Sequence, residues 1–351
     1  MTISVYILGL AVGQLIYGPL SDGLGRRPML MVGLLIYTVA GVAAAISSDV
    51  QTLIAARLFQ ALGGCAGLAL GRAIVRDTAK SDEAVRDLAL LNLMMMVGPG
   101  FAPILGSGLT VAFGWRSIFL LLAALGGVTL LFTWRLLPET NQPIGRFRPA
   151  LLLHDYKLLL RSKSFMGFAL GGGCATASIY AFIAAAPFII SSQLHRPLHE
   201  VGLYLGMLIA GMSLGNAITR HLIRTVSIER ILISANALSV ASALTLFVVT
   251  GLEALTLAVT IGLMFLFTLG AGATSPAALT KALDVESSLV GSAAGLYGFT
   301  QMAVGALCTI AVGIGHDPAL AAASVLTIVA SLGQIGFWMA LGWERATSRP
   351  M

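Results

Sequence analysis

Apolar residues are grouped along this chain in long runs that short polar segments interrupt. A run of about 20 apolar residues is long enough for a helix to cross the roughly 30 Å core of a bilayer. The runs do not alternate and are longer than barrel strands, which have about ten residues. Because a span in lipid must satisfy its own backbone hydrogen bonds, the pattern predicts an all-α membrane protein. The runs cover approximately residues 3–20, 29–47, 51–71, 88–112, 117–134, 165–191, 201–219, 230–250, 254–279, 288–313 and 319–342.

The composition supports these spans. The chain has 351 residues, of which 57% are hydrophobic and only 10% charged, and its mean hydropathy is +0.92. An ordinary soluble domain carries about 25% charged residues, and few soluble domains of this size could bury so many apolar residues. The first run has no basic residues before it, and Asp22, Arg26 and Arg27 follow it in place of a small-residue cleavage site. It is therefore predicted to be a span and not a signal peptide.

Basic residues are distributed unevenly among the loops. If successive runs cross the membrane in alternate directions, nearly all Lys and Arg side chains fall in loops on one side. The positive-inside rule predicts that this side, with the loop at residues 21–27 and the C-terminus, is cytoplasmic. The net charge of +6 then reflects orientation in an inner membrane and does not indicate nucleic-acid binding.

The longest polar connection divides the runs into five and six. We therefore predict an N-terminal helical bundle at residues 1–136, a cytoplasmic linker at 137–164 and a C-terminal bundle at 165–351. Within the linker, LLLHDYKLLL at 151–160 predicts an amphipathic helix on the inner membrane surface. After the seventh run, Gly215, Arg220 and Arg224 weakly repeat the pattern of a glycine and nearby bases that follows the first run.

The first inner loop, GPLSDGLGRR, predicts a conformational latch. Gly18 permits close approach of another helix, and Gly25 permits a tight turn. Asp22 would be favourable at the positive N-terminus of a neighbouring helix, and Arg26 and Arg27 would pair with an acid. The alternative is a generic positive-inside loop. The predicted latch comprises Gly18, Asp22, Gly25, Arg26, Arg27 and Asp77.

A second motif lies inside the third run, in LIAARLFQALGG. It places Arg57 in a span, which costs roughly 2.5–3.5 kcal/mol on insertion scales, so a functional role is the default hypothesis. Gln60 and Gly63 complete the motif. The alternative is that Arg57 extends to the nearby outer surface.

A third motif, GPGFAPILGSGL in the fourth run, predicts a bent helix. Pro103 removes a helix hydrogen bond, while Gly98 and Gly106 permit close packing. Such a bend would seal the inner side against leakage of substrate. The alternative is an ordinary proline kink.

These three motifs resemble those of the major facilitator superfamily, and the longer run SVYILGLAVGQLIYGPLSDGLGRRP resembles its Bcr/CflA drug-resistance subfamily. The LPET segment at residues 137–140 and TSPAALTKALDVESSLVGSAAGLYG also resemble that subfamily. The resemblance covers most of the chain and is stronger in its first half. It implies two helical bundles with about 11 transmembrane helices (5+6), and drug:proton antiport across the inner membrane.

The chain departs from the superfamily pattern at two points. Gly23 stands where the superfamily often has a base. The resemblance also implies a first helix, of twelve, that carries the acid of the proton site, and this helix has no counterpart here. All fifteen acids lie in loops or at helix ends. The sequence therefore predicts poor proton exchange by these residues alone, and a functional gene product that begins upstream.

The remaining predictions concern partners. Small apolar substrates, the bilayer and protons are expected partners of a monomer, with no nucleic acid, cofactor, metal or enzymatic activity. A sugar or amino-acid transporter and a truncated inactive remnant are the alternatives. The substrate site is predicted from aromatic and polar side chains within runs, for which helix packing or lipid contact is the alternative. These side chains are Tyr6, Gln14, Asn92, Tyr180, Tyr297 and Gln301.

Overall fold

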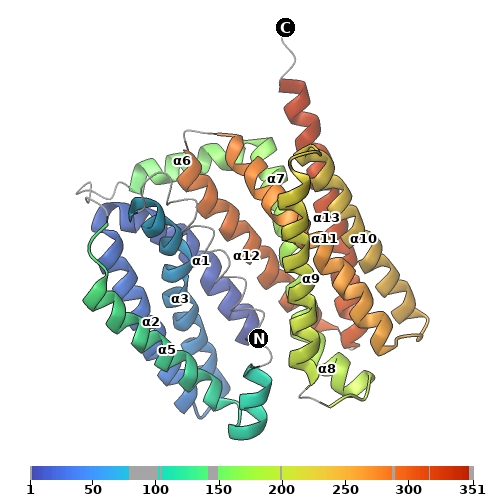
Figure 1. Cartoon of the computed structure of the whole chain (residues 1–351), viewed down its shortest axis with the longest axis horizontal. Coiled ribbons are helices and arrows are strands. Elements are labelled where there is room, and N and C mark those ends of the chain that lie inside the picture. Colours follow the sequence, from blue (N-terminus) through green and yellow to red (C-terminus); the bar gives the residue numbers. More distant parts are fainter. Residues whose placement is uncertain are drawn as a thin grey trace. The chain divides into compact units, whose positions relative to one another are not determined.

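The structure is a computed structural model that describes residues 2–78, 102, 105–140, 149–197, 200–286, 289–315 and 317–347. The secondary structure of these residues is entirely helical (Figure 1). Ten segments of this described part are long and apolar enough to cross a membrane. The prediction of an all-α, multi-pass membrane protein is thus confirmed. The fourth predicted span, at 88–112, lies mostly outside the described residues.

The described residues divide into two compact units. The first comprises those within 1–99 and 108–154, and the second those within 100–107 and 155–351. The helices of the first unit are α1 (Thr2–Leu24), α2 (Arg26–Ile46), α3 (Val50–Thr78) and α5 (Arg116–Leu136).

Small residues let the helices of the first unit approach closely. A Cβ atom added at Gly13 of α1 would lie 2.6 Å from the Cβ of Cys65 in α3. One added at Gly63 of α3 would lie 2.5 Å from the carbonyl oxygen of Gly33 in α2. Since lipid tails are as apolar as leucine, such close backbone packing is a main source of helix association in membranes. Helix α3 therefore packs against both α1 and α2, while α5 covers α2.

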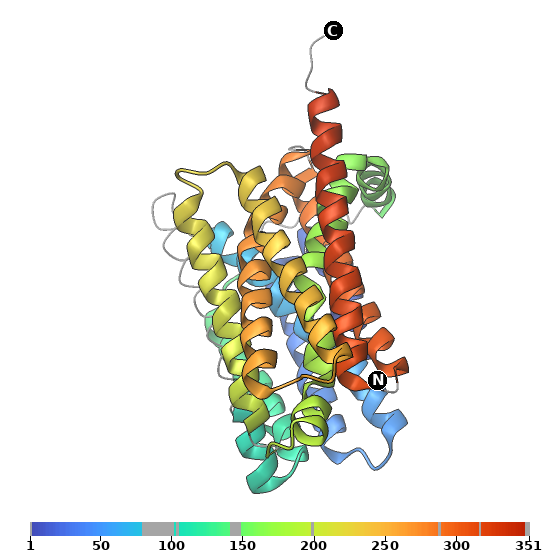
Figure 2. The same cartoon turned by 90° about the vertical axis from the view of Figure 1, so that its right-hand side faces the viewer.

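The second unit contains most of α6 and all later helices. Helix α11 packs against α7, α9 and α10, while α7 also packs against α12 and α13 (Figure 2). The fully buried Phe182, Phe267 and Leu326 lie in the core between them. The helices are α6 (Pro149–Arg161), α7 (Lys163–Ala177), α8 (Ile179–Phe188), the π-helix η1 (Ile189–Gln193), α9 (Val201–Leu222), α10 (Ile228–Gly251), α11 (Leu257–Asp284), α12 (Val290–Ile314) and α13 (Pro318–Thr347).

Two features of this unit relate to the sequence predictions. The run predicted at 165–191 is one span, Lys163–Gln193, but it is interrupted at Ser178, between α7 and α8. The amphipathic helix expected at 151–160 is present as α6. It lies across the end of α7 and not along it (Figure 1).

Candidate functional site

The junction between α1 and α2 is a tight turn at Gly25. This residue has φ +100°, in the left-handed region that favours glycine. Its N–H donates to the carbonyl oxygen of Ser21 at 3.0 Å, and α2 begins at the next residue, Arg26. The turn therefore places the free N–H groups of the α2 N-terminus next to the loop.

A carboxylate from outside the first loop occupies this N-terminus. The backbone N–H of Arg26 donates to Oε1 of Glu139 at 2.8 Å, and that of Arg27 donates to Oε2 at 3.2 Å. These N–H groups have no partner within α2, and the helix dipole favours a negative charge there by about 0.3–1 kcal/mol. A Cβ atom at Gly25 would lie 2.6 Å from Oε2 of Glu139. Gly25 is thus required by the space for the carboxylate as well as by its φ angle.

The two arginine side chains tie this turn to the ends of neighbouring helices. Arg26 is buried and donates to Oγ of Ser21, whose hydroxyl donates to the carbonyl oxygen of Gly18 at 2.7 Å. Nη2 of Arg27 donates to the carbonyl oxygen of Trp134, near the end of α5, at 2.7 Å. The turn, α1, α5 and Glu139 are therefore held together by hydrogen bonds at one end of the unit.

Two parts of the predicted latch have different outcomes. The side chains of Asp22 and Asp77 lie outside the described residues, so their pairing with the arginines stays a prediction. For Gly18, no described atom lies within 4 Å of an added Cβ. The close helix approach expected at Gly18 is therefore not present within the described part, where the hydrogen bond from Ser21 engages its carbonyl instead.

Arg57 lies inside the α3 span among aromatic side chains. Its guanidinium carbon is 3.9 Å from the ring centroid of Tyr6 in α1 and 5.5 Å from that of Phe119 in α5. Its Nη1 donates to Oε1 of Gln60 at 2.7 Å. Cation–π contacts of this kind contribute about 0.5–1 kcal/mol at exposed sites and about 2 kcal/mol when desolvated. The charge is thus held within the unit by its neighbours.

The amide of Gln60 completes this cluster. The Gln60 side chain is fully buried, and its Nε2 has no hydrogen-bond partner among the described residues. An added Cβ at Gly41 of α2 would lie 3.3 Å from this nitrogen, so Gly41 leaves room for the amide. The cluster therefore combines a cation with an unsatisfied donor inside a span.

The predicted bend in the fourth span is largely outside the described residues. This applies to Gly98 and Pro103, whereas Gly106 lies in a described helical segment at 105–113. The bend stays a prediction.

Several of the residues predicted to bind substrate contact other side chains of the chain. Tyr6 stacks on Arg57, Gln14 is half-buried in α1, and Asn92 lies outside the described residues. In the second unit, Nε2 of Gln301 in α12 donates to Oγ1 of Thr176 in α7 at 2.7 Å.

Two tyrosines lie along the same helix seam. The hydroxyl of Tyr297 in α12 contacts Gly172 of α7 and has no hydrogen-bond partner among the described residues. An added Cβ at Gly305 of α12 would lie 2.7 Å from Cδ2 of Tyr180 in α8. Together with Gln301, these side chains line the contact of α7 and α8 with α12, so in this conformation they contribute to helix packing.

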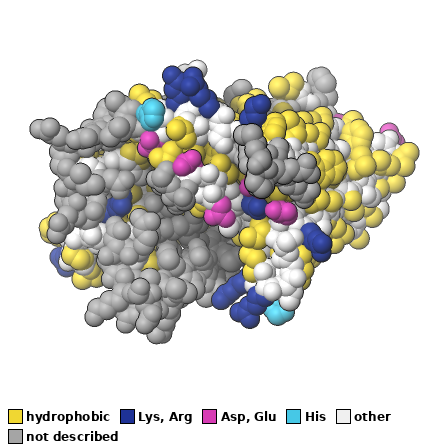
Figure 3. Space-filling model, turned by 90° about the horizontal axis from the view of Figure 1, so that it is seen from above, with side chains coloured by type: hydrophobic (Ala, Val, Ile, Leu, Met, Phe, Trp, Pro, Cys, Tyr) yellow, Lys and Arg dark blue, Asp and Glu magenta, His cyan; other side chains and the backbone are white. Residues whose placement is uncertain are grey.

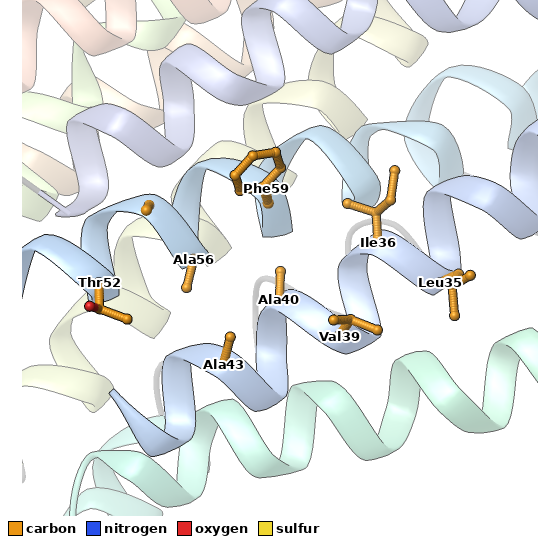
Figure 4. A pocket seen from close by; sticks show the side chains of 9 residues that line it. Leu35, Ile36, Val39, Ala40, Ala43, Thr52, Ala56 and Phe59 are labelled. Carbon is orange, nitrogen blue, oxygen red and sulfur yellow. The ribbon is translucent and has the colours of Figure 1, made fainter. Parts of the chain in front are cut away.

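Two apolar grooves lie on the first unit. One, of about 440 Å³, is lined by α2 and α3 (Figure 4). The other, of about 540 Å³, is lined by α2 and α5. Neither includes a residue that was predicted to bind substrate, and Val39 and Phe59 in the first are more than half exposed. Their composition suits contact with lipid chains.

An ion cluster in the second unit was not predicted. Nζ of Lys281 in α11 lies 3.2 Å from Oε1 of Glu229 in α10 and 3.0 Å from Oε2 of Glu344 in α13. It joins three helix ends that the charge pattern assigns to the cytoplasmic side. Glu229 and Glu344 lie 52 and 63 positions from Lys281, and residues so far apart cannot be paired by sequence spacing.

Comparison with known proteins gives a family match and several similar proteins. A family model described as Major Facilitator Superfamily matches residues 1–309. The chain is similar to the "Uncharacterized MFS-type transporter YdgK" of Bacillus subtilis (strain 168), with 30% identity over 349 residues that cover 96% of this chain and 85% of the relative.

Two further relatives have names that refer to drugs. The "Bicyclomycin resistance protein homolog" of Haemophilus influenzae is 25% identical over 308 residues, 87% of this chain and 77% of the relative. The "Multidrug transporter MdfA" of Yersinia pestis bv. Antiqua (strain Angola) is 28% identical over 232 residues, 66% of this chain and 57% of the relative.

A solved structure has a similar fold. It is the partially occluded inward-open conformation of the xylose transporter XylE from E. coli, with a TM-score of 0.71 and 12% identity. The match covers 100% of this chain and 88% of that one. The predicted fold class is confirmed by this likeness.

Proposed function

Because the chain belongs to the major facilitator superfamily, we propose that it is a secondary active transporter that exports drugs or other small apolar molecules. Two relatives are named for bicyclomycin resistance and multidrug transport, which supports a drug as the exported class. We place the chain in an inner membrane with its C-terminus in the cytoplasm, on the basis of the distribution of Lys and Arg.

The observation that carries this proposal is the Arg57 cluster. A charged side chain inside a span is costly and by default marks a substrate or ion pathway. Arg57 is held by Tyr6, Phe119 and Gln60, from two neighbouring helices and its own. An aromatic-lined cation of this kind would orient a polar group of an otherwise apolar substrate.

Proton antiport would supply the energy for export. Arginine stays protonated near neutral pH, so Arg57 can only tune a neighbouring group. Within the spans that the structure describes, the acids are Glu229, Asp284 and Glu344, and each lies at or next to the end of its span. The proton carrier must therefore lie outside the described spans or at the end of one.

The turn at Gly25 supports transport by alternating access. Movement of α2 relative to the segment after α5 would break the two hydrogen bonds to Glu139 and the one from Arg27 to Trp134. Each net contribution is about 0.5–1.5 kcal/mol, and somewhat more with a charged partner. Such a junction holds one conformation without making it permanent.

Export by cells that produce the chain tests this function. We expect cells with the parent chain to accumulate less of an uncharged fluorescent apolar compound than cells without it, and Arg57→Gln to abolish this difference. Arg116→Gln is the matched control, since Arg116 also stacks on an aromatic ring, that of Trp115 at 4.3 Å, but at the end of a span.

The outcomes separate the alternatives. Equal accumulation with the Arg57→Gln variant, at equal amounts in the membrane, would contradict the role of Arg57. Movement of a sugar or amino acid but no movement of the apolar compound would replace the proposed substrate class with a metabolite.

A further inference from the structure

Helix α6 has two chemically different faces. Leu153, Lys157, Leu160 and Arg161 are exposed and follow the i, i+4, i+7, i+8 spacing of a single helix face. Leu153 is 68% exposed and Leu160 52%, whereas Leu159 is fully buried. The helix therefore presents an edge of leucines beside a row of cations.

The acid of the helix lies on the opposite face. Asp155 is partly buried and accepts a hydrogen bond from Oγ of Ser292 in α12, at 3.4 Å. Lys157 and Arg161 have no hydrogen bond or ion pair with any described residue. Within the described part of the chain, no acid therefore balances the positive charge on the exposed face.

The position of α6 in the chain fixes it near the membrane surface. It ends at Arg161, and the next span begins at Lys163. Two residues extend at most about 7 Å, so Arg161 lies at the level of the lipid headgroups. Helix α6 also lies across the end of α7 in two perpendicular views (Figures 1 and 2). Because α7 crosses the bilayer, α6 runs along the bilayer surface.

We propose that the exposed face of α6 is a docking surface for anionic phospholipids of the leaflet on that side. The leucines would enter the boundary between headgroups and acyl chains, as in other interfacial amphipathic helices. Lys157 and Arg161 would contact the phosphate and anionic headgroups. Figure 3, which looks onto the end of the molecule that carries α6, shows Lys and Arg side chains beside hydrophobic ones. This inference does not depend on what the chain transports.

A fluorescent label on α6 tests the proposal. The full chain is prepared with its free cysteines Cys65, Cys174 and Cys308 replaced by alanine. Leu153→Cys then carries a polarity-sensitive fluorophore, and the chain is reconstituted in phosphatidylcholine vesicles with or without phosphatidylglycerol. We expect the emission to shift to shorter wavelength when phosphatidylglycerol is present, and the shift to weaken at high salt.

Paired variants identify the residues responsible. Lys157→Gln with Arg161→Gln should weaken the apparent affinity for phosphatidylglycerol roughly 25-fold, since each cation near an anionic surface strengthens binding about fivefold. Lys157→Arg with Arg161→Lys keeps the charge and should keep the affinity of the parent. Arg220→Gln with Arg224→Gln is the matched control, because these arginines are also exposed and four residues apart.

Three results would overturn the proposal. They are an equal shift in vesicles with and without phosphatidylglycerol, water-like emission in both, and a shift that depends on the protein-to-lipid ratio and not on lipid charge. The first would indicate apolar insertion alone, the second a helix in water, and the third a second copy of the chain as the partner.

Discussion

The two units hold their predicted cytoplasmic ends with different chemistry. In the first, Glu139 accepts from backbone N–H groups at the start of α2. In the second, Lys281 joins two carboxylates, Glu229 and Glu344, from separate helices. A backbone cap depends on one side chain and on the position of the helix end. An ion cluster needs three side chains together and, where it is exposed, is screened by salt. The second end should therefore be more sensitive to single substitutions.

Gly18 and Gly215, the glycines of the repeated loop pattern, also differ between the two units. Gly18 has no described atom within 4 Å of an added Cβ, whereas Gly215 in α9 packs directly on the backbone of α11. An added Cβ at Gly215 would overlap the carbonyl oxygen of Leu269 and lie 2.8 Å from the nitrogen of Ala273. Among the described residues, the weak sequence repeat thus marks a close helix contact at Gly215 and not at Gly18.

The largest expected effect follows from this difference. Gly215→Ala should destabilise the protein by about 1–3 kcal/mol, because overpacking against backbone cannot be relieved by a side-chain movement. Gly18→Ala, the matched control, should be tolerated by the fold. Thermal unfolding of the two variants in detergent compares them directly. Equal midpoints would remove the contrast between the two glycines.

The next effect concerns the ion cluster. Lys281→Met should destabilise the second unit by about 1 kcal/mol, since it removes the cation that joins the carboxylates of Glu229 and Glu344. The difference from the parent should shrink as salt is added. Arg220→Met at the exposed end of α9 serves as the control. If Lys281→Met unfolds at the parent's midpoint at low salt, the cluster does not hold the helix ends together.

The smallest effect on stability is expected at the cap. Glu139→Gln removes the charge and one acceptor, and should cost about 0.5 kcal/mol, near the lower limit for loss of a helix cap. We expect Glu139→Gln to slow export clearly although it lowers stability little, because the junction would move during transport. Glu253→Gln, at an exposed turn after α10, is the control. A variant that exports at the parent rate would show that the cap is only structural.

The spans could be predicted from the sequence because length and hydropathy decide which segments can cross a bilayer. The break at Ser178 could not, since α7 and α8 form one continuous apolar run with no proline or glycine at the break itself. Helix α6 was predictable because its leucines and charges alternate at helical spacing. Its two faces could be assigned only when the contact of Asp155 with Ser292 was known.

The candidate site was predictable in part. The loop motif predicted the turn because it places glycines and charges between two apolar runs. The second motif predicted Arg57 because a charge inside an apolar run is rare. The sequence did not indicate that Glu139 caps α2, since 113 residues separate it from Arg26. The sequence also did not show that Tyr297 and Gln301 pack against α7. The same helical spacing is found whether a polar side chain faces a neighbouring helix or a cavity. Long-range pairing of this kind is set by helix packing and not by local pattern.

The most direct test of the account is transport by the purified chain in sealed vesicles with an imposed pH gradient. We predict that an uncharged fluorescent apolar compound crosses the membrane faster with the protein than without it, that Arg57→Gln abolishes this difference, and that Arg116→Gln preserves it. The pH gradient should change the rate little, because the acids of the described spans lie only at or next to span ends. Equal rates with and without correctly inserted protein would contradict transport by this chain, and a large effect of the gradient would contradict the expected weak proton exchange.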